Sequence, residues 1–205
     1  MPQRPIMDAG PGVNFFALHK ERLLFGTLGA LAIPETVENE IRRKSRQDRR
    51  FEAAERVLAK VPEHLLEVLS DDEEENLSRV VSRMANMPMK QRLRSGKDLG
   101  ETMVVAHGVV AAESGDRALV LIDDGAGRDM AAAEQRRLVR LRAKGMDVGS
   151  LLLLSTVNVL EKAGGTEHIP DRGAMRDLYA KLRGLDDGLL PWEATRLGSL
   201  ECWKT

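Results

Sequence analysis

The apolar run of residues 118–122 is the feature that most constrains the fold. It ends abruptly in two adjacent carboxylates, Asp123 and Asp124, and Gly125 follows directly. Short apolar runs of this kind are typical of buried β-strands, and a strand that delivers paired acids to its carboxyl end could form half of a metal site. Asp followed by Asp-Gly is also ordinary turn chemistry after a strand. The rest of the chain has to distinguish a metal site from a turn.

Composition and charge narrow the possible classes of protein. The 205 residues suffice for one domain with a single core. Lys and Arg (31) nearly balance Asp and Glu (32), so no overall positive charge indicates a polyanionic partner. Aromatic residues, at 3%, are too few for a surface that stacks single-stranded bases. The single Cys202 excludes an intramolecular disulfide and a cysteine-based zinc cluster.

No apolar run reaches the length of a membrane span, and residues 1–12 lack the basic-then-apolar order of a signal peptide. We therefore expect a cytoplasmic protein without membrane contact.

Short strands and helices alternate along the chain. We predict strands over residues 4–7, 31–33, 64–69 and 118–122. Gly and Pro predict a turn over residues 8–12. We predict helices starting near Val13 and at Pro34, and over residues 51–60, 71–84 with Ser70 as N-cap, 98–113, 129–142, 151–160 and 171–185. The alternation predicts an α/β sheet covered by helices on both faces, with ligands at the carboxyl ends of the strands.

Acidic residues occupy four positions that such a fold could bring together. They are Asp8 after the first strand, Glu40 beside the apolar stripe of a helix, Glu101 at the start of an apolar helix, and Asp123 with Asp124. Carboxylate oxygens suit Mg²⁺ or Mn²⁺, whereas the scarcity of Cys and of spaced His argues against zinc. Clustered carboxylates repel one another, so a bound divalent ion is their natural counterion.

The same acids carry a resemblance to a known family. Asp8 in IMDAGPGVNF, Glu40 in IPETVENEI, Glu101 in DLGETMVVAHG and the acidic pair in LVLIDDGAGR follow the order of the four acidic motifs of PIN-domain proteins. The chain resembles this family from about Arg4 to Gly164, especially the subgroup with a Leu-Gly-Glu helix start and an Asp-Asp-x-x-Gly-Arg motif.

The resemblance implies a three-layer α/β/α sandwich with a mainly parallel sheet. Against the family pattern, residues 51–97 form a helical insertion between the second and third motifs, and a helical extension follows Gly164. We expect one PIN-like domain over residues 1–190 and a C-terminal tail over residues 191–205.

The resemblance also implies a metal-dependent nuclease, most often a VapC-like ribonuclease toxin with an antitoxin partner, and a homodimer is a further expected partner. Carried over to this chain, Asp8, Glu40, Glu101 and Asp124 would bind Mg²⁺ or Mn²⁺ and serve hydrolysis of RNA phosphodiester bonds. Similar motifs place the fourth acid two residues after the position of Ile122, which favours Asp124 and leaves Asp123 as its rival or helper. A non-catalytic PIN-like module that binds protein or RNA is the alternative.

Some residues outside the acidic motifs are candidates for binding the substrate or for a structural role. Arg42, Arg43, Arg46 and Arg128 could hold the RNA backbone, although a run of charges more often forms a solvated helix face. Asn14 is a candidate for orienting a bound water. His107, on an apolar helix, is expected to be a hydrogen-bonded histidine rather than a metal ligand.

Overall fold

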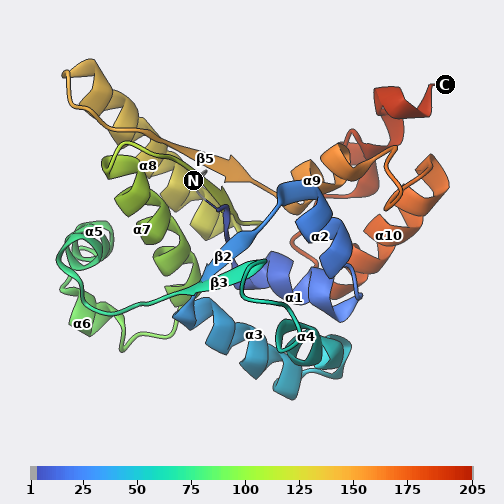
Figure 1. The fold of residues 1–205 in the computed structure, drawn as a ribbon, viewed down its shortest axis with the longest axis horizontal. Helices are drawn as coiled ribbons and strands as arrows, with labels where there is room; N and C mark the ends of the chain where they lie inside the picture. Colours follow the sequence, from blue (N-terminus) through green and yellow to red (C-terminus); the bar gives the residue numbers. More distant parts are fainter. Residues whose placement is uncertain (1–3, 205) are drawn as a thin grey trace.

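A five-stranded parallel sheet forms the centre of the molecule, in the order β3-β2-β1-β4-β5 (Figure 1). The computed structural model describes residues 4–204. The strands are β1 (Ile6–Met7), β2 (Leu31–Pro34), β3 (Leu66–Leu69), β4 (Arg117–Leu121) and β5 (Ser150–Leu154). With helices on both sides of the sheet, the predicted three-layer α/β/α sandwich is confirmed.

Helices connect the strands and extend the chain beyond the sheet. The α-helices are α1 (Ala9–Ala17), α2 (Glu21–Leu28), α3 (Glu35–Gln47), α4 (Glu52–Leu58), α5 (Glu75–Ala85), α6 (Met89–Arg92), α7 (Leu99–Glu113), α8 (Gly125–Ala143), α9 (Thr156–Ala163) and α10 (Arg172–Leu185). Short 3-10 helices are η1 (Arg49–Phe51), η2 (Trp192–Ala194), η3 (Leu197–Ser199) and η4 (Glu201–Trp203). Within residues 4–204, none of the helices combines the length and the hydropathy needed to cross a membrane.

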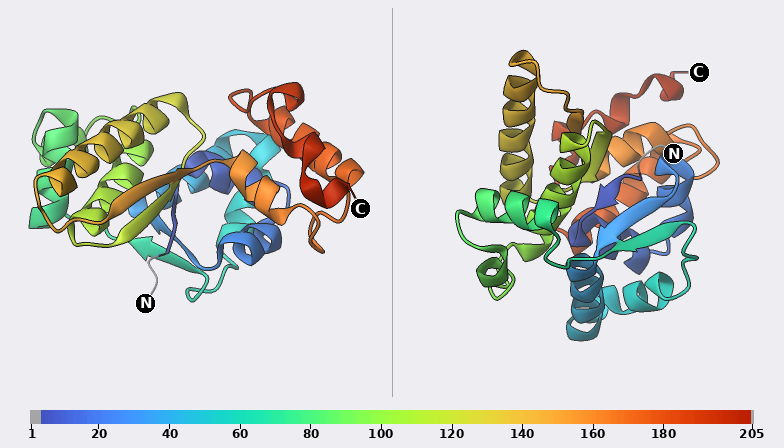
Figure 2. Two further views of the ribbon diagram at one scale, coloured as in Figure 1. Left: turned by 90° about the horizontal axis from the view of Figure 1, so that it is seen from above. Right: turned by 60° about the vertical axis from the view of Figure 1, so that its left-hand side comes forward.

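The order of the strands reverses direction between β1 and β4. From β1 the chain builds outward through β2 to β3, then crosses to the other side of β1 with β4 and β5. Because crossovers between parallel strands are almost always right-handed, the two directions place their helices on opposite faces. Figures 1 and 2 show α1–α4 on one side of the sheet and α5–α8 on the other. The carboxyl ends of β1 and β4 therefore flank a topological switch point, the usual ligand position in such sheets.

The helix predicted over residues 151–160 is wrong in its first half and confirmed from Thr156 onward. Residues 150–154 form β5, which pairs in parallel with β4 along its whole length, and α9 begins at Thr156. A short leucine run fits a buried strand and a buried helix equally well, so the pairing with β4 decides. A capping box between Ser155 and Asn158 starts the helix immediately after the strand.

Two helix starts also differ from the sequence prediction. The turn predicted over residues 8–12 is wrong, because α1 begins at Ala9 and accommodates Pro11 in its first turn. The helix predicted to start after Ser70 begins only at Glu75. Asp71 does not start that helix but joins two others: its carboxylate accepts a hydrogen bond from Thr36 N (2.7 Å), and its Oδ1 lies 3.0 Å from His107 Nε2. The hydrogen-bonded interpretation of His107 is thereby confirmed.

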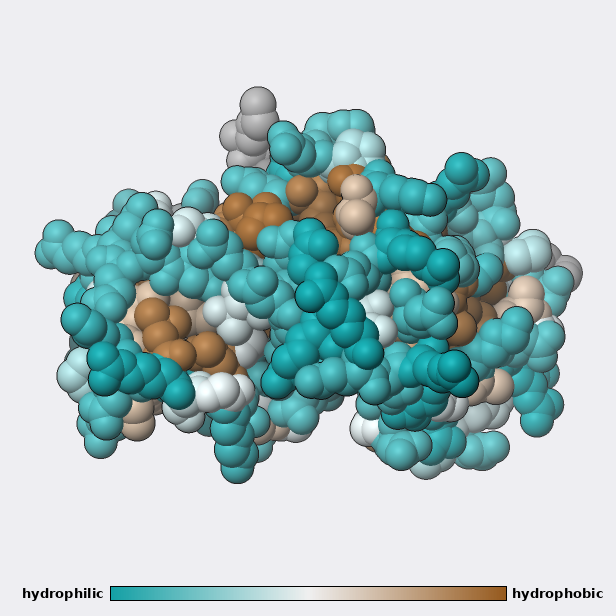
Figure 3. All heavy atoms as spheres, turned by 90° about the horizontal axis from the view of Figure 1, so that it is seen from below, coloured by the Kyte–Doolittle hydropathy of each residue, from teal (hydrophilic) through white to brown (hydrophobic). Residues whose placement is uncertain are grey.

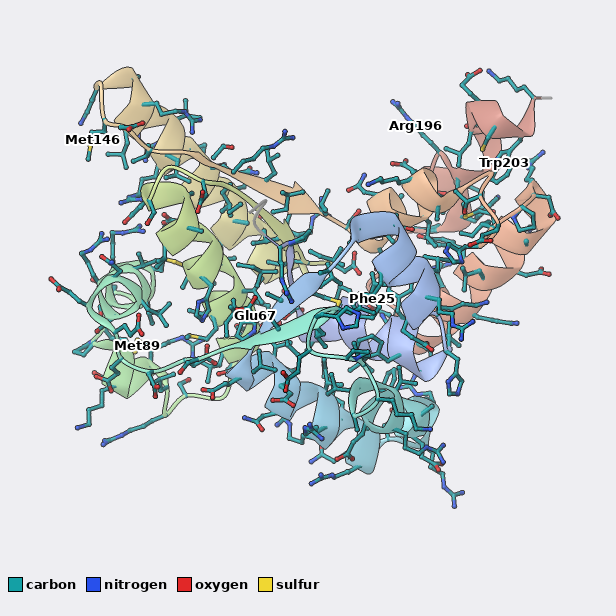
Figure 4. The ribbon with its side chains drawn as sticks, viewed as in Figure 1. Phe25, Glu67, Met89, Met146, Arg196 and Trp203 are labelled. Atoms are coloured by element: carbon teal, nitrogen blue, oxygen red, sulfur yellow. The ribbon has the colours of Figure 1, made fainter. Side chains whose placement is uncertain are left out.

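The segment of residues 51–97 contributes to the sheet as well as to the helices. Its strand β3 pairs with β2 at one edge of the sheet. After α9, helix α10 and the 3-10 helices η2, η3 and η4 form the expected C-terminal extension. There the rings of Tyr179 and Trp192 lie 5.9 Å apart, and Trp203, labelled in Figure 4, donates from Nε1 to Leu197 O. The end of the chain is thus packed onto α10, which in turn contacts α1.

Candidate functional site

A small cavity of about 230 Å³ lies at the carboxyl edge of the sheet, at the switch point between β1 and β4. We call it the carboxylate cavity; it is lined by Asp8, Gly10, Lys44, Glu101, Asp123, Asp124, Gly125, Asp186 and Gly188. Helices α1, α7 and α8 all begin at this edge, so the positive ends of their dipoles point toward it. The fold therefore gathers here three of the four predicted acidic positions.

Asp8 is the most buried of these acids. It is 4% exposed and caps α1 by accepting a hydrogen bond from Gly10 N (3.3 Å) at Oδ2. Its Oδ1 is buried and has no hydrogen-bond partner. Burial raises the pKa of Asp8 to about 7, with a further contribution from the charge of Glu101. A buried carboxylate oxygen without a donor is costly unless a cation or a proton satisfies it.

Glu40 and Glu101 approach Asp8 from two different helices. A Cβ added to Gly100, at the start of α7, would lie 2.9 Å from Glu40 Oε2 and 3.5 Å from Asp8 Oδ1. The glycine therefore lets α7 pack closely against both acids. Burial raises the pKa of Glu101, and the nearby charge of Glu40 raises it further. Glu40 thus borders the carboxylate cavity, and all four predicted acidic positions meet.

The adjacent acids Asp123 and Asp124 have different partners. Asp124 caps α8, where its Oδ1 accepts from Ala126 N (2.8 Å) and Gly127 N (3.2 Å), so Oδ2 remains available for another ligand. Both oxygens of Asp123 accept from Thr156, from the backbone N (2.8 Å) and from Oγ1 (2.5 Å). Burial raises the pKa of Asp123, partly offset by these hydrogen bonds. The geometry therefore favours Asp124 as the freer of the two carboxylates.

Asp186, at the end of α10, lines the same cavity and was not among the predicted site residues. Its Oδ2 accepts from Asn14 Nδ2 (3.0 Å) and its Oδ1 from Gly188 N (2.9 Å). One signal was present in the sequence: Asp-Asp-Gly occurs at residues 123–125 and again at 186–188. The C-terminal extension thus supplies one wall of the site.

The residues predicted to bind substrate do not line the carboxylate cavity. Arg42 pairs with Glu38 (2.6 Å), and Arg46 pairs with Glu55 (2.5 Å). Figure 3 shows a strongly hydrophilic surface over this part of the molecule, as a solvated helix face requires. Arg43 and Arg128 are exposed, whereas Asn14 is buried and donates to Asp186. Lys44 is the cationic side chain that lines the cavity.

The donor set suits a hard divalent cation. The acids around the cavity offer carboxylate oxygens, which are the ligands that hard divalent cations prefer. One of these oxygens, Asp8 Oδ1, is buried and lacks a hydrogen-bond partner. Among residues 4–204, no three His, Cys, Asp or Glu side chains already stand in the arrangement of a formed metal site. Metal binding would therefore require rotation of the Glu40, Glu101 or Asp124 side chains toward Asp8.

Searches of protein-family models, curated proteins and solved structures found no match to this chain. The resemblance to PIN-domain proteins thus rests on the acidic motifs alone.

Proposed function

We propose that the chain is a metal-dependent nuclease of the PIN-domain type, which hydrolyses RNA phosphodiester bonds at the carboxylate cavity. The observation that carries the proposal is the buried, partnerless Oδ1 of Asp8, with further carboxylates converging beside it at the switch point. RNA as the substrate, and an antitoxin as a partner, follow from the resemblance of the motifs to the family.

Asp8, Glu40, Glu101 and Asp124 are the residues that would hold Mg²⁺ or Mn²⁺. A bound ion of this kind lowers the pKa of a water ligand and stabilises negative charge on phosphate oxygens. Asp8 supplies the most rigid ligand, because its Oδ2 is fixed by Gly10 N at the start of α1. Asp124 is fixed in the same way at the start of α8. Two helix starts on neighbouring strands thus set the distance between the two acids.

Asp123 and Asp186 have a positioning role in this proposal. The contact of Asp123 with Thr156 ties the end of β4 to the start of α9. The contact of Asp186 with Asn14 ties the end of α10 to α1. Both contacts hold the walls of the cavity in place, so these two acids would shape the site without reaching the reacting phosphate.

The experiment compares Mn²⁺ binding and RNA cleavage in the wild type, in Asp8→Asn and in Asp129→Asn. Asp129 is an exposed acid on α8 that does not line the cavity, so its variant is the matched control for loss of one negative charge. We expect Asp8→Asn to lower cleavage by about 10²-fold or more and to weaken Mn²⁺ binding, because this residue supplies the central ligand. Asp129→Asn should retain both.

Other results of this experiment would contradict the proposed site or favour the non-catalytic alternative. Equal cleavage by wild type and Asp8→Asn would contradict the proposed site. Tight RNA binding without cleavage by the wild type would favour the non-catalytic alternative. Structured RNA, unstructured RNA and single-stranded DNA are assayed in parallel, because the carboxylates specify the reaction whereas the surrounding loops select the substrate.

A further inference from the structure

Lys44 brings a positive charge into an otherwise acidic cavity. Its side chain lines the carboxylate cavity, and its Nζ lies 2.9 Å from Glu40 Oε1. Position 44 is four residues after position 40, so both side chains project from the same face of α3. On that helix Val37 and Ile41 are fully buried, which fixes the rotation of α3 and therefore the side on which Lys44 lies.

A neighbouring ion pair on α3 shows that this placement is not required for helix stability. Arg42 and Glu38 have the same spacing and a shorter distance of 2.6 Å, yet neither lines the cavity. Pairs of this kind stabilise a helix only weakly, wherever they lie on its surface. The position of Lys44 at the cavity therefore needs a further explanation.

We propose that Lys44 is a substrate-positioning residue that competes with the metal ion for Glu40. In the absence of metal, its ammonium neutralises Glu40, as the 2.9 Å contact shows. If Glu40 held the metal ion, Lys44 would be released, and its ammonium would bind a non-bridging oxygen of the RNA phosphate. This inference rests on the proposed function, because it assigns a role within the same site.

The chemistry of lysine fits both states. The ammonium is a compact point charge with three donors on a flexible stem, and it binds carboxylate or phosphate without a fixed plane of approach. The Lys44 side chain is 39% exposed, so it can turn between the two partners without unpacking the core. Arg42 and Arg46 are held by Glu38 and Glu55. Lys44, which lines the cavity, is thus placed to meet a phosphate there.

Removal of this charge should change metal binding and cleavage in opposite directions. Without Lys44, the cavity attracts a divalent cation more strongly, and we expect Mn²⁺ to bind roughly three- to tenfold more tightly. Cleavage at saturating Mn²⁺ should nevertheless be about tenfold or more slower, because the phosphate loses a charged donor. A residue that only stabilised α3 would change neither quantity.

The experiment measures Mn²⁺ affinity by electron paramagnetic resonance of the free ion, and single-turnover RNA cleavage at saturating Mn²⁺. The variants are Lys44→Met, Lys44→Arg and the control Arg56→Met, which removes a cation from the i,i+4 pair of Arg56 with Glu52 on α4. We expect tighter binding and slower cleavage in Lys44→Met only. Lys44→Arg keeps the charge and should stay close to wild type in Mn²⁺ affinity. Thermal melting verifies that each variant is folded.

The possible failures are distinguishable. If the wild type binds Mn²⁺ and cleaves RNA but Lys44→Met matches it in both respects, the inference about Lys44 is wrong and the proposed nuclease stands. Weaker Mn²⁺ binding in Lys44→Met would overturn the competition for Glu40. If the wild type binds no Mn²⁺, the proposed function itself fails and the inference fails with it.

Discussion

Two groups of acids, each with one buried member, differ in what neutralises them. In the carboxylate cavity, Asp8 has a buried oxygen without a partner. In the arginine network, formed by Arg79, Arg83 and Arg137 with Glu113 and Glu134, every acid has guanidinium partners. The pKa shifts have opposite signs: that of Asp8 is raised to about 7, whereas that of Glu113 is lowered.

The acids of the arginine network are neutralised by side chains of the protein itself. Arg83 binds Glu134 through two hydrogen bonds of 2.6 and 2.9 Å, and Glu134 is 6% exposed. Burial alone would raise the pKa of Glu113, but hydrogen bonds from Arg79 and Arg137 lower it. The network joins α5, α7 and α8 and needs no external ion. Acids that are fully paired with arginines have a structural role in this protein. The buried, unpartnered oxygen of Asp8 instead points to a ligand.

The largest expected effect is on the stability of Asp8→Asn. At pH 8 without metal, the wild type carries an ionised Asp8 that is disfavoured by burial, and the variant does not. The pKa difference from 3.8 to about 7 corresponds to up to about 4 kcal/mol, so the variant should be more stable by at most this amount. Urea unfolding in a metal chelator measures the difference. A less stable variant would show that Asp8 is held by contacts within the protein.

The pH dependence of stability should follow the same carboxyl group. Because its pKa is raised on folding, the folded protein keeps the Asp8 proton between pH 3.8 and about 7, while the unfolded chain releases it. The stability contributed by Asp8 is therefore complete below pH 3.8 and is lost as the pH rises to about 7. Comparing the urea unfolding of wild type and Asp8→Asn from pH 4 to pH 8 isolates this contribution.

Mg²⁺ should act against that loss, because the ion stabilises the ionised form of Asp8. We expect saturating Mg²⁺ to restore stability at pH 8 in the wild type and to have little effect on Asp8→Asn. An equal effect of Mg²⁺ on both proteins would place its binding elsewhere.

Breaking the arginine network should have an effect of opposite sign. Glu134→Ala removes the most buried acid of the network and leaves Glu113 as the remaining counterion of Arg83 and Arg137. We expect a loss of about 2 kcal/mol in the free energy of unfolding, because hydrogen bonds to charged groups are lost. The control is Glu52→Ala, which removes the exposed partner of Arg56 and should cost less than about 0.5 kcal/mol. Both are measured by urea unfolding at pH 7. A loss similar to that of the control would show that the network contributes little.

Much of the site could be predicted from the sequence because it follows the ends of strands. Asp8 comes directly after β1 and Asp124 lies three residues after the end of β4, and both are helix caps. Contacts between residues far apart in the sequence could not be predicted in this way. The leucines of β5 match a helix as well as a strand until the partner strand is known, and Asp186 reaches the cavity only through the packing of α10 on α1.

The spacing of Lys44 from Glu40 indicates that the two side chains share a face of the helix. The neighbouring arginines carry the same charge, so the sequence alone does not single out Lys44 as a site residue. Which of these cations faces the cavity depends on the rotation of α3, which burial of Val37 and Ile41 fixes.

The smallest predicted effect is a difference in Mn²⁺ binding between variants of Asp123 and Asp124. These adjacent acids again differ in whether contacts within the protein satisfy both carboxylate oxygens. Asp123 is satisfied by Thr156, whereas Asp124 uses one oxygen for its cap and keeps the other available. Asp123→Asn and Asp124→Asn each remove one negative charge, and Asn is as good a helix cap as Asp. If Asp124 is the ligand, we expect Asp124→Asn to weaken Mn²⁺ binding about tenfold more than Asp123→Asn, because only it loses a metal–oxygen contact. Isothermal titration with Mn²⁺ decides between them, and the reverse order would make Asp123 the ligand and require its contact with Thr156 to open on metal binding.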